Sequence, residues 1–123
     1  MLWWKSIVLS VPMSMMLMGS AQAETFVMTR FSTMMLLSLS ECIKEAKRAL
    51  KTEGFEENLD SSRFKDGSGS AWGGRDNGQY KAVIKCLPDH ELLFFAVAGP
   101  EEDTVGRYMK NLDSPEREGW GLR

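Results

Sequence analysis

The chain has 123 residues, the length of one small domain with a short extension. Its 17 acidic and 15 basic residues give a net charge of −2, and the basic residues form no cluster. Proteins that bind nucleic acids or anionic lipids concentrate positive charge on one surface, so the composition argues against both kinds of partner.

The first 23 residues have the three parts of an export signal. Lys5 supplies a positive charge, residues 6–19 form an apolar run, and Ala21-Gln22-Ala23 offers the small residues that signal peptidase recognises. The run is shorter than the roughly 20 apolar residues of a membrane-spanning helix, and no cysteine follows Ala23 to carry a lipid. We therefore expect a bacterial protein that is cleaved after Ala23 and is periplasmic or secreted, with no membrane segment in its mature form.

The mature chain is predicted to start with a strand and a helix. Residues 25–32 alternate loosely between two faces, as strands do. Ser38 and Glu41 have the spacing of a capping box, so a helix is expected to begin there and to end at Gly54, a residue that favours the left-handed conformation. The apolar residues in between recur at helical spacing and are Leu39, Cys42, Ile43, Ala46, Ala49 and Leu50.

The middle of the chain, residues 55–79, is polar and rich in glycine and serine, and it is expected to form a long loop or a weak pair of strands. Asn77-Gly78 predicts a tight hairpin, because both residues tolerate positive φ angles. Such a turn would let residues 71–75 pair with the strand that follows. Residues 80–87 alternate as a strand does, and one face carries Tyr80, Ala82, Ile84 and Cys86.

Two more elements complete the predicted domain. Residues 92–98 are an uninterrupted apolar run and are expected to form the central strand. Pro100 and the acidic residues after it are typical of the start of a second helix. Its apolar stripe consists of Val105, Tyr108, Met109 and Leu112. Residues 113–123 are predicted to be a polar C-terminal tail that carries Trp120.

These elements predict one α+β domain over residues 24–112, an antiparallel sheet of three to five strands in the order β-α-(β)-β-β-α, with two helices on one face. Cys42 lies on the apolar stripe of the first helix and Cys86 on the core-facing side of a strand. In an oxidising compartment such a pair is expected to form one disulfide. A redox role is the alternative reading, although redox cysteines are usually two residues apart at an exposed turn.

Two surfaces are candidates for binding. The glycine-rich segment 67–78 carries Trp72, Arg75 and Asp76, a mixture expected where a loop binds a sugar, a peptide or a carboxylate. The alternative is a flexible hairpin in which Trp72 covers the sheet. The second candidate is the sheet face opposite the helices, which is expected to carry Lys81 and Lys85 among apolar neighbours. That face would suit an envelope protein or a second copy of the chain in a homodimer.

No catalytic set stands out in the sequence. His90 is the single histidine and is interpreted as a solvated residue of a turn. The carboxylates of the polar loop are scattered, so no acid and base pair can be assigned from spacing. We therefore predict no metal, no cofactor and no nucleic-acid partner, and the sequence favours a non-catalytic role while leaving enzymatic activity open.

Three stretches, Glu41-Cys42-Ile43-Lys44-Glu45-Ala46, residues 80–86 and residues 94–100, resemble small exported bacterial α+β proteins of unassigned function that have a helix-to-strand cysteine pair. The resemblance covers most of residues 26–112 and implies no particular activity.

Taken together, these features favour a non-catalytic periplasmic module that binds a protein or a small ligand. One alternative is a small envelope hydrolase or transferase that uses Asp60, Asp66 or Asp76 with Arg75. Another is a thiol-handling or metal-handling protein, for which Cys42 would have to be reactive.

Overall fold

A computed structural model describes residues 24–33 and 38–113 of the chain. The predicted signal segment, residues 1–23, and the end of the predicted tail, residues 114–123 with Trp120, lie outside the described residues. Within the described ranges, neither helix combines the length and the hydropathy needed to span a bilayer.

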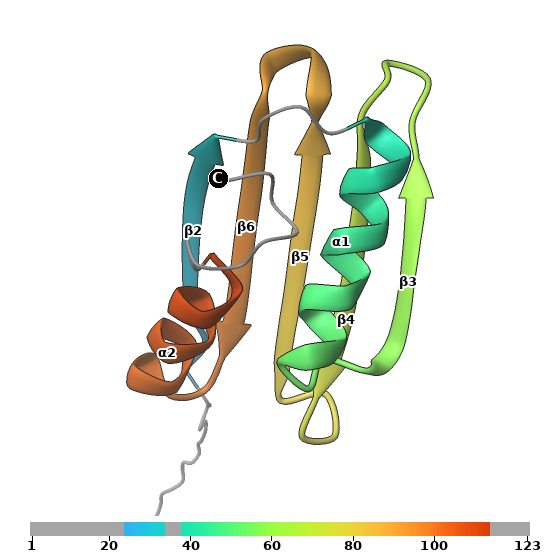
Figure 1. Ribbon diagram of the computed structural model, residues 1–123. Coiled ribbons are helices and arrows are strands. Elements are labelled where there is room, and N and C mark those ends of the chain that lie inside the picture. The colour runs from blue at the N-terminus through green and yellow to red at the C-terminus, as the bar shows by residue number, and fades with distance from the viewer. Residues whose placement is uncertain (1–23, 34–37, 114–123) are drawn as a thin grey trace, which may run out of the picture.

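The described chain forms one five-stranded sheet and two α-helices (Figure 1). In chain order the elements are β2 (Phe26–Thr33), α1 (Leu39–Thr52), β3 (Glu57–Arg63), β4 (Gly69–Arg75), β5 (Tyr80–Leu87), β6 (Leu92–Gly99) and α2 (Glu102–Leu112). Across the sheet the order is β2-β6-β5-β4-β3, and every neighbouring pair is antiparallel. The predicted α+β class, the antiparallel sheet and the two helices are confirmed.

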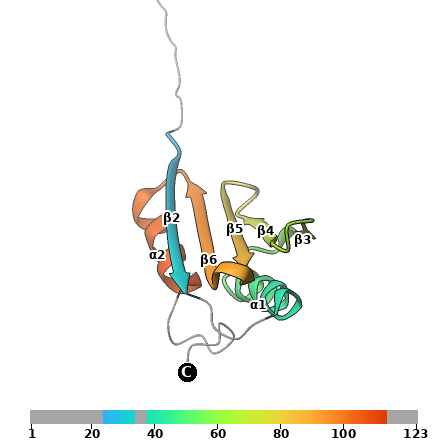
Figure 2. The ribbon, with the colours of Figure 1, turned by 90° about the horizontal axis from the view of Figure 1, so that it is seen from above.

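Both helices cover the same face of the sheet (Figure 1). Helix α2 packs on β6 and β2, whereas α1 packs on β4, β3 and β5 (Figure 2). The residues of β5 and β6 alternate in burial, as strands with one covered face do. The buried strand side chains that face the helices are Ala71, Tyr80, Ala82, Ile84, Cys86, Leu93, Phe95 and Val97. They form a single core with the apolar stripes of both helices.

The capping box at the start of α1 is present. The Ser38 hydroxyl accepts a hydrogen bond from the Glu41 backbone N–H at 3.1 Å, and the Glu41 carboxylate accepts one from the Ser38 backbone N–H at 3.0 Å. The bonds from the Ser38 backbone and side chain hold the pKa of Glu41 below its ordinary value. The helix ends at Thr52, and Gly54 follows with a φ of +91°, as its sequence predicts.

The polar middle of the chain forms the two strands β3 and β4, which decides between the two predicted alternatives. Glycines in β4 allow α1 to approach the sheet closely. A Cβ built on Gly69 would lie 2.9 Å from Ile43 Cδ1, and one built on Gly73 would overlap the Phe55 carbonyl oxygen. These glycines lower the strand signal of the sequence, but Gly69 is required by the packing of α1 and Gly73 by the packing of the Phe55 backbone, which follows the helix.

The close approach of α1 brings Cys42 and Cys86 together. Their Cα atoms are 6.2 Å apart, the sulfurs form a disulfide, and both residues are fully buried. The predicted disulfide is therefore confirmed. The described chain contains no free cysteine, so Cys42 is not the exposed thiol that a redox or metal-handling role requires.

The two tight connections around β5 follow their sequences closely. Asn77 and Gly78 have φ angles of +58° and +79°, and the Gln79 N–H donates to the Asp76 carbonyl at 3.2 Å. At the other end, a short 3₁₀ turn over Pro88–His90 leads into β6.

Two details differ from expectation. The central strand of the sheet is β5, because β2 pairs on the far side of β6 and makes β6 the second strand. Helix α2 begins at Glu102 rather than at Pro100, because Gly99 still belongs to β6 and the proline leads the chain out of the strand.

Candidate functional site

The sheet face opposite the helices is covered by no element of residues 24–33 and 38–113 (Figure 1, Figure 2). Strand alternation places Lys81 and Lys85 on this open face, as the sequence predicts. The apolar or small side chains that share it are Val27, Phe31, Val83, Leu87, Leu92, Phe94, Ala96 and Ala98.

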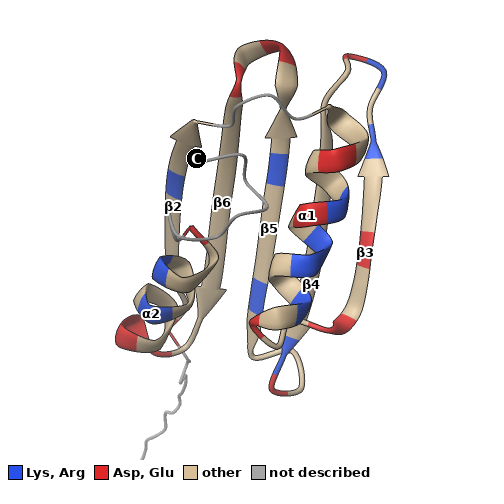
Figure 3. Ribbon diagram, viewed as in Figure 1, with Lys and Arg blue, Asp and Glu red and all other residues tan. Residues whose placement is uncertain are grey.

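One side of the open face is apolar. Val27 is 65% exposed and Phe31 is 64% exposed, and the Phe31 ring lies 5.0 Å from that of Phe94 on the neighbouring strand. We call Val27, Phe31 and Phe94 the β2 patch. Figure 3 shows that β6 carries no charged residue and that the two lysines of the face lie on β5. Large apolar side chains that are exposed side by side are one feature of surfaces that contact partners.

The two edges of the sheet differ in how they are protected against further strand pairing. At the β3 edge the register shifts between Glu57 and Asp60, and Asn58 has a φ of +53°. Irregularity and charge are features that discourage pairing with another chain. Strand β2 pairs with β6 in regular register over all eight residues, and its one charged residue, Arg30, bonds Asp113 at 3.3 Å. The β2 edge therefore lacks the protection that β3 has.

The other side of the open face contains a hollow of about 390 Å³ between β3, β4 and β5. It forms around Gly74, which pairs with Glu57 on β3 and with Lys81 on β5. Gly74 contributes no side chain to the hollow, and Trp72 stands two residues away on the same face. We call this the Trp72 hollow, and its polar or aromatic lining consists of Glu57, Asn58, Trp72, Asn77 and Lys81.

The polar groups around the Trp72 hollow fall into two classes. The Glu57 carboxylate is anchored, because it accepts hydrogen bonds from the backbone N–H groups of Asn77 and Gly78, both at 2.9 Å. The side chains of Asn58, Trp72, Asn77 and Lys81 have no hydrogen-bond or ion-pair partner within the part of the chain that the structure describes. Their donors and acceptors are therefore available to a ligand.

The structure does not bring the three predicted loop residues together. Trp72 lines the hollow on the open face. Arg75 is three residues further along the same strand, and because successive side chains of a strand point to opposite faces, it points to the helix side. There the Arg75 guanidinium donates to the Glu53 carbonyl after α1 and lies 4.5 Å from the centre of the Tyr108 ring. Its Nε is 3.5 Å from the Asp76 carboxylate, an ion-pair distance. Arg75 thus joins α1, β4 and α2, while Trp72 faces solvent on the other side.

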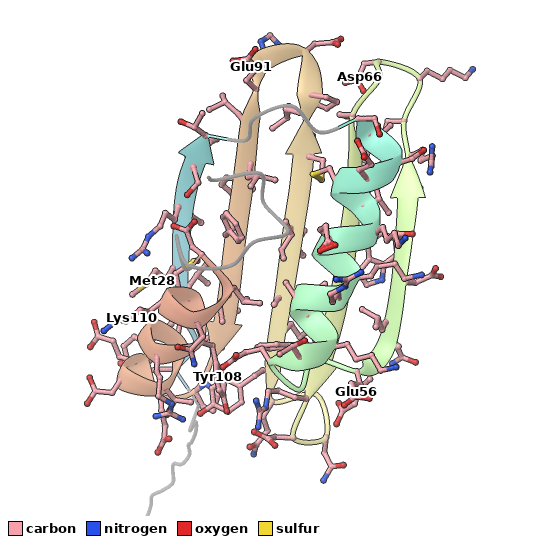
Figure 4. All side chains as sticks on the ribbon, in the orientation of Figure 1. Met28, Glu56, Asp66, Glu91, Tyr108 and Lys110 are labelled. Carbon is pink, nitrogen blue, oxygen red and sulfur yellow. A yellow bond between two sulfur atoms is a disulfide. The ribbon has the colours of Figure 1, made fainter. Side chains whose placement is uncertain are left out.

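The carboxylates of the hydrolase hypothesis are also apart. Asp60 lies on β3, Asp66 in the turn before β4, and Asp76 in the turn at the opposite end of β4. Figure 4 shows Asp66 at the same end of the sheet as Glu91, far from Glu56 and Tyr108. The described residues contain no group of three or more His, Cys, Asp or Glu side chains that could hold a metal ion.

A smaller hollow of about 120 Å³ lies between the β3–β4 turn and the turn that carries His90. Asp66 on its wall accepts hydrogen bonds from the Ser68 hydroxyl at 2.6 Å and the Ser68 N–H at 2.9 Å. These two hydrogen bonds lower the pKa of Asp66, and the bond from the Ser68 hydroxyl has the larger effect. The carboxylate is therefore committed to holding the turn.

Of the residues that line the Trp72 hollow, sequence reasoning missed Glu57 and Asn58, and it assigned Asn77 and Lys81 to two separate candidate surfaces. The sequence did contain a pattern that could have placed Lys81 in this lining. The Asn77-Gly78 turn fixes the register of β4 against β5, and that register places Lys81 beside Gly74. Comparison with known proteins finds no matching family model, no matching curated protein and no matching solved structure.

Proposed function

We propose that the protein is an exported bacterial protein, periplasmic or secreted, whose domain is a non-catalytic protein-interaction module. Two features support export. Residues 1–23 read as a signal peptide with cleavage after Ala23, and the buried Cys42–Cys86 disulfide is typical of proteins that fold in an oxidising compartment.

The single observation that carries the interaction role is the β2 edge together with the β2 patch. A regular, nearly uncharged edge strand offers a row of backbone donors and acceptors to another strand. Its exposed side chains include the apolar Val27 and Phe31. We propose that the partner is a second copy of the chain that pairs through the same edge.

The sequence of β2 suits such a symmetric pair. In an antiparallel β2–β2 pair with the two-fold axis at Thr29, Val27 of each copy lies opposite Phe31 of the other, on the same open face. Pairs of an aromatic and a β-branched residue across neighbouring strands each contribute roughly 0.2–1 kcal/mol. One strand pair buries a small interface, so we expect a reversible dimer with a dissociation constant in the micromolar range.

Sedimentation velocity over a range of protein concentrations tests the dimer. We expect the wild-type protein to shift from monomer to dimer as the concentration rises. Phe31→Asp places a carboxylate opposite Val27 in both halves of the pair and is expected to give monomer throughout. Phe64→Asp is the matched control, because Phe64 is an aromatic residue that is 46% exposed, beyond the end of β3. A wild-type protein that stays monomeric at all concentrations, or a dimer that survives Phe31→Asp, contradicts the proposed interface.

Intact mass spectrometry tests export separately. Full-length protein expressed in a bacterium is expected to accumulate in the periplasmic extract or the medium with Glu24 as its first residue. A variant in which Ala21 and Ala23 are both replaced by leucine is expected to keep the leader, because signal peptidase requires small residues there. Recovery of the wild-type chain from the cytosol with residues 1–23 attached would argue against export.

A further inference from the structure

We propose that the Trp72 hollow is a binding site for a neutral saccharide. This site goes beyond the β2 interface proposed above, because the two surfaces lie toward opposite edges of the sheet and have no residue in common. The proposal rests on three properties of the hollow, namely its shape, its aromatic wall and its balance of charge.

The shape of the hollow depends on a missing side chain. A Cβ built on Gly74 would meet the Tyr80 carbonyl oxygen at 3.3 Å, Glu57 Oε1 at 3.6 Å and Glu57 Cβ at 3.9 Å, so a side chain there would extend into the hollow beside Glu57. The volume of about 390 Å³ is within the range of roughly 300–1,000 Å³ that small-molecule sites have. A single sugar ring can therefore sit on the sheet surface between β3 and β5.

Trp72 gives the hollow an aromatic wall. Its indole is partly exposed, and its N–H has no partner among the described residues. An indole combines an apolar face with one polar donor. A sugar ring has the matching character, because its C–H groups pack on an aromatic face while its hydroxyls extend sideways.

The remaining groups suit hydroxyls better than an apolar ligand. The side-chain amides of Asn58 and Asn77 each offer donors and an acceptor, as a hydroxyl does. An apolar ligand would strip water from these amides without replacing its hydrogen bonds, which is unfavourable. A ligand with several hydroxyl groups satisfies them.

The charges around the hollow favour a neutral ligand. Lys81 supplies one positive charge and Glu57 one negative charge, and both line the same hollow. Asp60, the cross-strand neighbour of Trp72, adds a second acid close by, with its carboxylate bonded to the Ser61 N–H at 2.8 Å. An anionic sugar would be attracted by Lys81 and repelled by the two carboxylates. The hydroxyls of an uncharged saccharide can donate hydrogen bonds to the carboxylates and accept one from Lys81.

Binding is tested by ¹H–¹⁵N NMR titration of the purified protein with two neutral tetrasaccharides, cellotetraose and tetra-N-acetylchitotetraose. We expect at least one of them to shift the Trp72 indole N–H and the amides of Gly74, Gly78 and Lys81, while the amides of β2 stay unchanged. The Trp72 indole signal is assigned by its loss in Trp72→Phe. Affinity is expected to change less than about twofold between low and moderate salt, because no net charge is neutralised.

Three variants locate the site. Trp72→Ala removes the aromatic wall and is expected to weaken binding at least about tenfold, the equivalent of roughly 1.4 kcal/mol. Asn77→Gly removes one amide but keeps the turn, because glycine accepts the positive φ, and is expected to weaken binding about two- to tenfold. Phe64→Ala changes an exposed aromatic outside the hollow and is expected to leave binding unchanged.

Several outcomes would overturn the proposal. They are the absence of shifts with both tetrasaccharides, shifts centred away from the Trp72 hollow, or unchanged affinity in Trp72→Ala and Asn77→Gly. If glucuronate binds more tightly than glucose in the same titration, and its affinity falls steeply at higher salt, the ligand is anionic and the proposal of a neutral one is wrong. None of these results bears on the β2 dimer, which is tested separately by sedimentation velocity.

Discussion

The Cys42–Cys86 disulfide is expected to contribute a large part of the stability of the domain. It closes a loop with a sequence separation of 44 residues. In the chain-entropy model a loop of that length removes enough freedom from the unfolded chain to stabilise the fold by about 4 kcal/mol at 25 °C. Small domains unfold with a total free energy of roughly 5–15 kcal/mol, so reduction should leave this one only marginally stable.

Two perturbations separate the effect of the crosslink from that of packing. Reduction opens the bond but keeps both sulfur atoms in the core, so we expect the loss of about 4 kcal/mol that the crosslink alone supplies. The double variant Cys42→Ala, Cys86→Ala also removes two fully buried sulfurs. It is expected to lose roughly 1–2 kcal/mol more than the reduced wild type, because the small voids that remain forfeit their contacts.

Urea unfolding followed by circular dichroism, with and without reductant, measures both effects. The dependence of unfolding free energy on urea is also expected to be steeper for the reduced protein, since an unfolded chain without the crosslink exposes more surface. A difference below about 1 kcal/mol between oxidised and reduced protein, with equal urea dependence, would refute the view that the bond acts by restricting the unfolded chain.

Three further substitutions test local contacts. Gly99→Ala places a Cβ against the ring of Tyr80 and is expected to lower the unfolding free energy by about 1–3 kcal/mol in the urea assay. Gly106→Ala, inside α2, adds a methyl with only an ordinary contact at 3.6 Å and is expected to raise the unfolding free energy by about 0.5–1 kcal/mol. Equal effects of the two substitutions on the unfolding free energy would contradict these contacts. Ser68→Ala removes the hydroxyl that lowers the pKa of Asp66, so NMR titration of that carboxyl group is expected to show a higher pKa. A lowered folded pKa adds stability above the unfolded pKa that is lost as the pH falls through the folded pKa, so the stability gap between wild type and Ser68→Ala should narrow in acid; a gap independent of pH would count against this role.

Local signals made the helices, the hairpin and the disulfide predictable. The capping box of Ser38 and Glu41 depends on a spacing of three residues, and the Asn77-Gly78 turn on the conformational tolerance of two. The Cys42–Cys86 pair needed one additional step, because each cysteine had to face the core of its own element. None of these inferences required knowledge of distant neighbours.

Strands β3 and β4 were harder to predict because their residues are determined by tertiary contacts, which the sequence does not show. Strand β3 is a polar edge strand with a shifted register, so it lacks clear alternation. In strand β4, Gly69 leaves room for Ile43 of α1 and Gly73 leaves room for the backbone of Phe55, a tertiary reason that overrides the low strand propensity of glycine. The same uncertainty hid the orientation of Trp72 and Arg75, which share a site only if the segment is a loop. Once β4 is a strand, its two-residue period sends them to opposite faces.

The candidate surfaces required the strand order as well. The β2 patch exists because β2 pairs at the edge beside β6, which brings Phe31 against Phe94. The Trp72 hollow exists because β3 and β5 flank the same glycine of β4. The Asn77-Gly78 turn encodes the pairing of β4 with β5, but the pairings of β2 with β6 and of β3 with β4 depend on how the whole sheet assembles.

The position of β2 at the start of the domain has a consequence for folding. Its neighbour β6 is the last strand, and Phe26 pairs with Gly99. A chain that emerges with its N-terminus first, from a ribosome or through a membrane pore, releases β2 long before β6 is available. Contacts so distant in sequence form slowly. During that interval β2 has no strand to pair with, and unpaired apolar segments of this kind expose an unfinished chain to aggregation.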